Sequence, residues 1–195
     1  MPGWSCCWIT FKDSKATGYR CDVHSTLREE VKTMTVLVAY ESKHGSTQGI
    51  AERISEKLRQ MGKETDVLSV DTVSDPGSYE AFVIGSAIYY GSWMREATDW
   101  VKRNQSILAN RPVWLFSSGP LGTEVKDAEQ QPKEMADFHN TIKPRDHRVF
   151  FGSLDHNKLS FTERMVVKAV RAPEGDYRDW EAIDAWAESI ARDLG

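Results

Sequence analysis

The sequence predicts an α/β fold in which a doubly wound, five-stranded parallel sheet has the strand order 2-1-3-4-5. Short β-branched and apolar runs alternate with amphipathic stretches throughout the chain from Met34 onward. The first, third and fourth runs are mostly apolar, as expected for strands that helices cover on both faces. Five runs favour this strand order over the six-stranded dinucleotide-binding fold.

The expected strands are defined by these apolar runs and by the polar or glycine-containing segments that bound them. In chain order they are Thr35–Tyr40, Glu64–Val70, Ala81–Ser86, Val113–Ser117 and His147–Gly152. Right-handed crossovers between parallel strands then place helices on both faces of the sheet.

Three stretches have apolar residues at helical spacing, and we interpret these stripes as core packing. The first, which ends at Gly62, contains Ile50, Ala51, Ile54, Leu58 and Met61. The second contains Trp93, Ala97, Trp100, Val101, Ile107 and Leu108. The third contains Trp180, Ile183, Trp186, Ala187, Ile190 and Leu194.

Two long segments do not fit a minimal five-stranded plan. Gly119–Arg145 lies about where a fourth helix belongs, but it is polar and is interrupted by Pro132 and Pro144. Ser153–Arg178 separates the fifth strand from the last helix. Loops of this length in a compact domain are usually functional or disordered, and both interpretations stay open here; in an oxidoreductase, these two segments would form the wall of a substrate site.

The first 33 residues differ in composition from the rest of the 195-residue chain. They contain all three cysteines, Cys6, Cys7 and Cys21, and lack helical or strand periodicity. We interpret residues 1–33 as an irregular leader that is either dispensable or wrongly included in the sequence, and residues 34–195 as the domain. The alternative is a genuine N-terminal module. Any redox chemistry of the domain should therefore belong to a cofactor rather than to cysteines.

Composition excludes several classes of function. The net charge of −4 argues against a nucleic-acid partner, which usually requires a basic surplus. No apolar run reaches the roughly 18–20 residues of a membrane span. No CxxC pair or histidine spacing indicates a metal site, and we expect His139, His147 and His156 to be structural or exposed. A cytoplasmic location is the default expectation.

The loop after the first strand predicts a phosphate site. In open parallel sheets, ligands bind at the carboxyl ends of strands beside the point where the strand order reverses. This loop lacks the GxxxxGK[ST] and GxGxxG motifs. It instead offers backbone N–H groups, hydroxyls and a helix N-terminus to one phosphate. Its expected cofactor-binding residues are Ser42, Lys43, His44, Gly45, Ser46 and Thr47. The alternative is that Ser46 or Thr47 simply caps the helix.

The loops after the third and fourth strands could frame a flat ring. Two adjacent tyrosines follow the third strand and could form one wall, unless they pack on the neighbouring helix. That loop contains Ala87, Ile88, Tyr89, Tyr90 and Gly91. The other loop has small residues that permit close approach, and it contains Ser117, Ser118, Gly119, Pro120, Leu121 and Gly122. A phosphate loop beside two such loops fits a mononucleotide with a planar heterocycle, such as FMN.

The sequence resembles the flavodoxin-like family. The resemblance begins with Val36–Tyr40 followed by Ser42–Thr47, which is similar to that family's strand and phosphate loop, and it spans Met34 to Gly195. Three further segments resemble the FMN-containing, quinone-dependent protoporphyrinogen dehydrogenases of the family: Val83–Gly91, Phe150–Asp155 and Leu159–Trp180. The Glu174–Asp176 part of the second long segment is shorter here than in those enzymes.

The resemblance implies an FMN-dependent oxidoreductase that oxidises protoporphyrinogen IX or a similar large substrate with a quinone as acceptor. FMN would carry the chemistry, and no catalytic side chain is assigned. The alternative is a soluble electron carrier with a protein redox partner. The fourth-strand loop has no Tyr or Trp, so one ring face would stay open, which favours the enzyme. A third alternative is a phosphorylated receiver domain, which needs an Asp at the end of the third strand. Gly85–Ser86 occupies that position, and this argues against a receiver domain.

A contact with the membrane is also expected. Phe161, Met165, Val166 and Val167, with the basic residues near them, could form an amphipathic face at the inner surface of the cell membrane or near a quinone. A surface helix packed on the core explains the same pattern.

Overall fold

The computed structural model of the protein describes residues 34–119, 131–155, 165 and 175–195. Its central sheet has the order β2-β1-β3-β5-β6, and these five strands are parallel. Counted along the chain, this is the predicted order 2-1-3-4-5, which is confirmed. The strands are β1 (Thr35–Glu41), β2 (Glu64–Ser69), β3 (Ala81–Tyr89), β5 (Val113–Ser118) and β6 (Asp146–Phe150).

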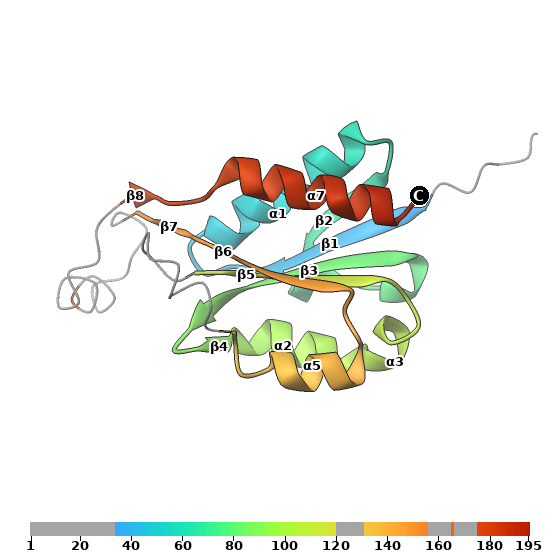
Figure 1. The fold of residues 1–195 in the computed structure, drawn as a ribbon. Helices are drawn as coiled ribbons and strands as arrows, with labels where there is room; N and C mark the ends of the chain where they lie inside the picture. Colours follow the sequence, from blue (N-terminus) through green and yellow to red (C-terminus); the bar gives the residue numbers. More distant parts are fainter. Residues whose placement is uncertain (1–33, 120–130, 156–164, 166–174) are drawn as a thin grey trace, which may run out of the picture. The chain divides into compact units, whose positions relative to one another are not determined.

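Helices cover both faces of the sheet (Figure 1). One face carries α1 (Ser46–Gln60) and α7 (Trp180–Asp193), which pack against each other. The other carries α2 (Arg95–Arg103), α3 (Gln105–Leu108) and α5 (Met135–Thr141). Two short 3-10 helices, η1 (Val70–Thr72) and η2 (Pro76–Ser78), connect β2 to β3.

The alternation of side chains along the central strands divides the core into two layers. Val36 and Val38 of β1 face α1 and α7, whereas Leu37 and Ala39 face α2, and all four are fully buried. Burying an aliphatic side chain of this size stabilises the fold by about 1.5–3 kcal/mol. The predicted assignment of the apolar stripes to the core therefore agrees with the two buried layers, except for Met61, which follows the last turn of α1 and is 45% exposed.

Several boundaries differ from the sequence-based expectations. The second helical stripe is broken into α2 and α3 at Asn104, whose backbone (φ −103°, ψ 13°) leaves the helical region. A fourth helix, α5, forms between Pro132 and Pro144 because the prolines flank it and do not interrupt it. Strand β6 ends at Phe150 rather than Gly152, which leaves Gly152 free to approach other loops.

The second long segment is closed at its base by a two-stranded pair. Residues Ser153–Leu154 (β7) pair antiparallel with Gly175–Asp176 (β8). Two-residue strands carry no periodic signal, so sequence reasoning missed them. Residues 1–33 lie outside the described residues, as do most of Phe161–Val167, so the leader and the membrane-facing stretch stay predictions. Met165 is described, and its side chain is exposed.

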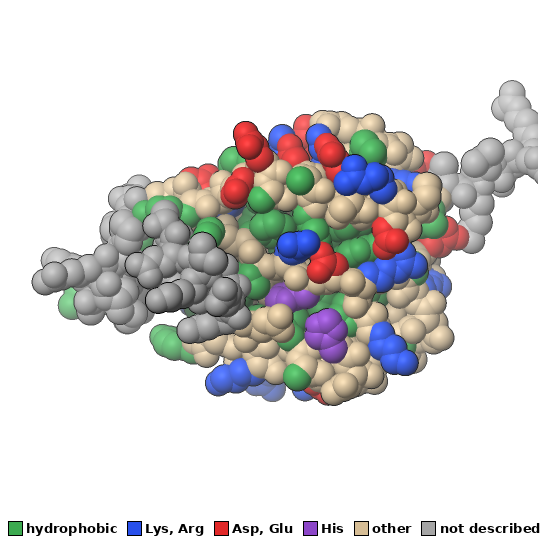
Figure 2. Space-filling view, in the orientation of Figure 1, with side chains coloured by type: hydrophobic (Ala, Val, Ile, Leu, Met, Phe, Trp, Pro, Cys, Tyr) green, Lys and Arg blue, Asp and Glu red, His purple; other side chains and the backbone are tan. Residues whose placement is uncertain are grey.

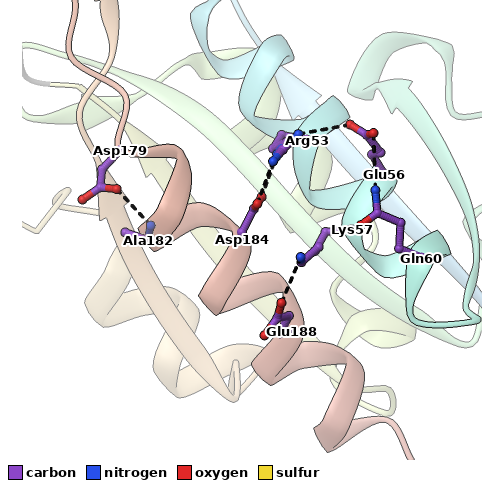
Figure 3. Close-up of polar contacts among 8 residues, drawn as sticks. All are labelled: Arg53, Glu56, Lys57, Gln60, Asp179, Ala182, Asp184 and Glu188. Atoms are coloured by element: carbon purple, nitrogen blue, oxygen red, sulfur yellow. Dashed lines mark hydrogen bonds and ion pairs between the residues drawn. The ribbon is translucent and has the colours of Figure 1, made fainter.

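Polar contacts join α1 to α7 on the outside of the first layer. Arg53 donates two hydrogen bonds of 2.7 Å to Asp184, and Lys57 Nζ lies 2.9 Å from Glu188 (Figure 3). The side chain of Arg53 is 40% exposed, so solvent screens this pair and it adds little to the stability of the fold. Charges of both signs are interspersed over α7 and the β6 edge in Figure 2 rather than gathered into one patch. Among the described residues, no helix is long and apolar enough to cross a membrane.

Candidate functional site

The carboxyl ends of β1, β3 and β5 lie side by side, as the strand order requires. Glu41 is in register with Ser86, and Ala87 is in register with Ser118. The three following loops also approach one another. Lys43 Nζ lies 5.7 Å from the centre of the Tyr89 ring, and a β-carbon at Gly119 would lie 3.7 Å from the carbonyl oxygen of Ile88. The structure therefore brings together the described residues of all three predicted loops.

The N-terminus of α1 has no side-chain cap. Its N-cap residue is Gly45, at φ 86°, and the first turn contains no acidic residue. Ser42 Oγ accepts a 3.0 Å hydrogen bond from the Gly45 N–H, which shapes the turn before the helix. The alternative that Ser46 or Thr47 caps the helix is therefore wrong. The first N–H groups of α1 and its positive dipole end are left for an anion.

The hydroxyls of the first turn have different environments. Ser46 Oγ accepts a hydrogen bond from the Ser153 N–H at 2.9 Å and lies 3.4 Å from Ser118 Oγ, so it links three strand ends. Thr47 is 1% exposed, and its Oγ1 has no hydrogen-bond partner among the described residues. A buried hydroxyl without a partner costs about 1–3 kcal/mol. A ligand oxygen at this turn would relieve that cost.

The tyrosines lie on a tight hairpin. Strand β4 (Ser92–Trp93) pairs antiparallel with the end of β3, so that Tyr90 and Gly91 form the two-residue turn. Their φ angles, 52° and 76°, are those of a type I′ turn, which a tyrosine adopts only at some strain. The alternative in which Tyr90 packs on a helix is wrong, because this side chain is 92% exposed; Tyr89 is 37% exposed.

The opposite side of the site has only small residues at the end of β5. Ser117 and Ser118 are buried, and Gly119, at φ 115°, follows them; Pro120, Leu121 and Gly122 lie outside the described residues. In the buried part of the strands, the Phe116 ring packs directly against Gly85. A β-carbon at Gly85 would lie 2.0 Å from the Phe116 ring, so only glycine fits there.

A series of hydrogen bonds connects the loops after β3 and β5 on the side of the sheet that α2 covers. Trp93 Nε1 donates a 2.7 Å hydrogen bond to Ser117 Oγ, which lies 2.9 Å from His147 Nε2. Burial, together with the nearby His139, lowers the pKa of His147 from 6.5 to about 4. His147 is therefore neutral near pH 7, and its structural role agrees with the prediction. His139 is exposed, and His156 lies outside the described residues.

Sequence reasoning missed four residues near the first turn of α1 or the end of β1. Glu41 has a buried oxygen without a described partner, and burial and then Asp71 and Glu96 raise its pKa. Gly152 and Ser153 contact Ser46, and Arg178 lies against Gly49. The rule that ligands gather at strand carboxyl ends could have found the Gly152 region. No local signal identifies Arg178, which is 129 positions beyond Gly49 in the sequence.

The fold and the loop arrangement are those of a flavodoxin-like α/β protein. The Flavodoxin domain family matches residues 37–181, and the chain belongs to this family. FMN is the cofactor of a flavodoxin domain, so the predicted cofactor is confirmed at the level of the family. The uncapped turn, the Thr47 hydroxyl without a described partner and the close approach of Gly119 to Ile88 fit a phosphorylated, flat ligand.

Known proteins support the same assignment. The chain is 23% identical over 172 residues to a protoporphyrinogen IX dehydrogenase [quinone] of Escherichia coli (strain K12), covering 81% of this chain and 95% of that protein. It is 25% identical over 173 residues to a protein of the same name from Leishmania major, covering 80% and 74%. A flavodoxin from the domain Archaea superposes with a TM-score of 0.56 at 15% identity, covering 83% and 99%. Flavodoxin 1 of Bacillus cereus gives a TM-score of 0.56 at 12% identity, covering 83% and 99%. The two solved structures support the flavodoxin-like fold, and the two relatives are dehydrogenases by name.

Proposed function

We propose that this protein oxidises protoporphyrinogen IX, or a reduced substrate of similar size, and passes the electrons to a quinone. The observation that carries the proposal is that the two sides of the expected flavin site carry different side chains. The β3–β4 hairpin presents two exposed tyrosines, whereas the β5 end presents Ser118 and Gly119. Because the sequence from Ser117 to Gln130 contains no Tyr or Trp, a flavin ring between these walls would be stacked by aromatic side chains on one face only. The E. coli and L. major relatives supply the substrate and acceptor classes.

The phosphate of FMN is assigned to the first turn of α1. Backbone N–H groups of this turn and the Thr47 hydroxyl would hold it, with the Lys43 ammonium adding positive charge. Ser42 shapes the turn through Gly45, and Ser46 fixes it to Ser153. The isoalloxazine ring would lie between Ala87–Gly91 and Ser117–Gly119. Bound FMN supplies two-electron redox chemistry, and the side chains bind and orient it.

The overall reaction balances without a further reagent. The substrate loses an electron pair and two protons for each double bond formed, and the quinone takes up both to become a quinol. Tyr90, which is 92% exposed, would extend the covering wall beyond the flavin ring, and the large planar substrate would approach the ring from the β5 side. A peripheral contact with the membrane, where quinones are dissolved, is part of this proposal, and its surface is the predicted Phe161–Val167 stretch.

The test is quinone-dependent turnover by protein loaded with FMN. Purified protein is reconstituted with FMN and mixed anaerobically with protoporphyrinogen IX and menadione, and porphyrin fluorescence is recorded. We expect porphyrin formation that requires protein, FMN and quinone together. Controls omit the protein, the FMN or the quinone in turn.

The runner-up function gives a different result in the same assay. If the protein binds FMN but forms no porphyrin above the controls, the electron-carrier alternative replaces the dehydrogenase. If the protein does not bind FMN at all, both functions are wrong.

A further inference from the structure

Arg178 is held rigidly beside the layer that contains α1 and α7. Its Nε and Nη2 donate hydrogen bonds of 2.7 and 2.6 Å to the two carboxylate oxygens of Asp176. Its guanidinium carbon lies 4.4 Å from the centre of the Trp180 ring. The side chain is 17% exposed, and the hydrogen bonds from Arg178 lower the pKa of Asp176. A bidentate pair stacked on an indole fixes the guanidinium plane more tightly than a surface ion pair would.

The remaining nitrogen of Arg178 is directed at α1. A β-carbon at Gly49 would lie 2.5 Å from Nη1, closer than real contacts allow, so the guanidinium occupies the space that any other residue would need. Glycine inside a helix costs about 1 kcal/mol relative to alanine. The close approach of Arg178 is the structural reason for a glycine at this position.

Gly49 lies one turn from the N-terminus of α1. It is three residues beyond Ser46, which corresponds to about 4.5 Å along the helix axis. The guanidinium is therefore well within a Debye length, about 8–10 Å, of the uncapped turn and of the unpartnered Thr47 hydroxyl. The residue before Arg178 also reaches this turn, because the Tyr177 N–H donates to the Gly152 carbonyl, and Gly152 contacts Ser46.

We propose that Arg178 is a specificity-determining residue of the flavin site, which favours the phosphorylated flavin, FMN, over unphosphorylated riboflavin. The inference rests on the proposed phosphate position. Asp176 pairs with Nε and Nη2, so the positive end of this ion pair that faces α1 is Nη1. This end adds to the helix dipole near the expected phosphate, and its approach to Gly49 fixes the turn that supplies the N–H groups. Riboflavin lacks the phosphate and gains nothing from this charge.

The experiment compares the dissociation constants of FMN and riboflavin, measured by quenching of flavin fluorescence. In Arg178→Gln, we expect FMN binding to weaken about tenfold, which is about 1.4 kcal/mol, while riboflavin binding changes less than twofold. Arg178→Lys, which keeps the charge, should restore most of the ratio. Arg53→Gln is the matched control because it removes a positive charge from α1 that is also paired with an aspartate; it should leave the ratio unchanged.

Gly49→Ala provides a second perturbation without a change of charge. The added methyl must displace Nη1, so we expect FMN binding to weaken about threefold in the otherwise unaltered protein and not at all in Arg178→Gln. An equal loss of FMN and riboflavin binding in Arg178→Gln, or no loss of either, overturns the proposal. A protein that binds neither flavin before any substitution refutes the flavin site itself, which is a separate outcome.

Discussion

Replacing Thr47 by valine should have opposite effects on folding and on FMN binding. Thr47 is 1% exposed, and its Oγ1 is buried with no partner among the described residues. Valine has nearly the same shape and helix propensity, and it removes only the hydroxyl. Without ligand the substitution relieves a desolvation cost. With FMN it removes a donor to the phosphate.

The expected magnitudes follow from these two environments. An unpartnered buried hydroxyl costs about 1–3 kcal/mol, so the free energy of unfolding without FMN should rise by about 1 kcal/mol. For a domain of this size, that rise corresponds to a midpoint about 2–4 °C higher. A hydrogen bond to a charged group is worth about 1.5–3 kcal/mol, so the dissociation constant for FMN should increase at least about tenfold.

The assay is thermal unfolding without ligand together with a fluorescence titration of FMN. Thr65→Val is the matched control. Thr65 is also buried, but its hydroxyl is hydrogen-bonded to Ser55 Oγ, so this substitution should lower the stability by about 1–2 kcal/mol and leave FMN affinity unchanged. The reasoning is refuted if Thr47→Val lowers the stability without FMN as Thr65→Val does, or if it leaves FMN affinity unaltered.

Three further predictions concern the fold around the site. Because the pKa of His147 in the folded protein, about 4, lies below its ordinary 6.5, its contribution to stability is complete above pH 6.5 and falls by about 3 kcal/mol as the pH drops to 4. Urea unfolding of His147→Gln should show a smaller loss over that range; equal losses in both proteins would contradict the assignment. Gly85→Ala should cost about 3 kcal/mol because of the collision with Phe116, measured as a shift of the urea midpoint, and a change below about 0.5 kcal/mol would argue against the packing. A double-mutant cycle of Arg53→Ala and Asp184→Ala, measured by urea unfolding, should show nearly additive effects with a small coupling that decreases with salt. A strong coupling would show that this half-exposed pair is a main support of α7.

The sheet could be predicted from the sequence because its strands are buried on both faces. Val36–Ala39 and Ala81–Ile84 are continuous apolar runs. Short runs of this kind are typical of parallel strands that are buried on both faces, so their position in the centre of the sheet could be predicted. Helix α5 was less accessible to prediction because only Met135, Phe138 and the following Ile142 contribute apolar surface, and they do so within a polar segment. Strands β7 and β8 could not be predicted, because each is two residues long and forms only by pairing with the other, which is distant in the sequence.

The candidate site was predictable as far as strand order determines it. The carboxyl ends of β1, β3 and β5 must be neighbours in this topology, so the three loops could be brought together without coordinates. Side-chain roles within the loops could not be assigned in the same way. Ser46 looks like Thr47 in the sequence, yet one hydroxyl bonds to Ser153 and the other has no described partner. Arg178 reaches the first turn of α1 through tertiary packing alone, and no spacing rule covers that distance.

The central claim is that the flavin site accepts electrons from a large reduced substrate and delivers them to a quinone. The most direct measurement is the flavin absorbance of FMN-loaded protein under anaerobic conditions. On addition of protoporphyrinogen IX the flavin bands should bleach, and a quinone added afterwards should restore them with formation of quinol. Flavin bands that stay unchanged with the reduced porphyrin, although dithionite bleaches them, would contradict the account.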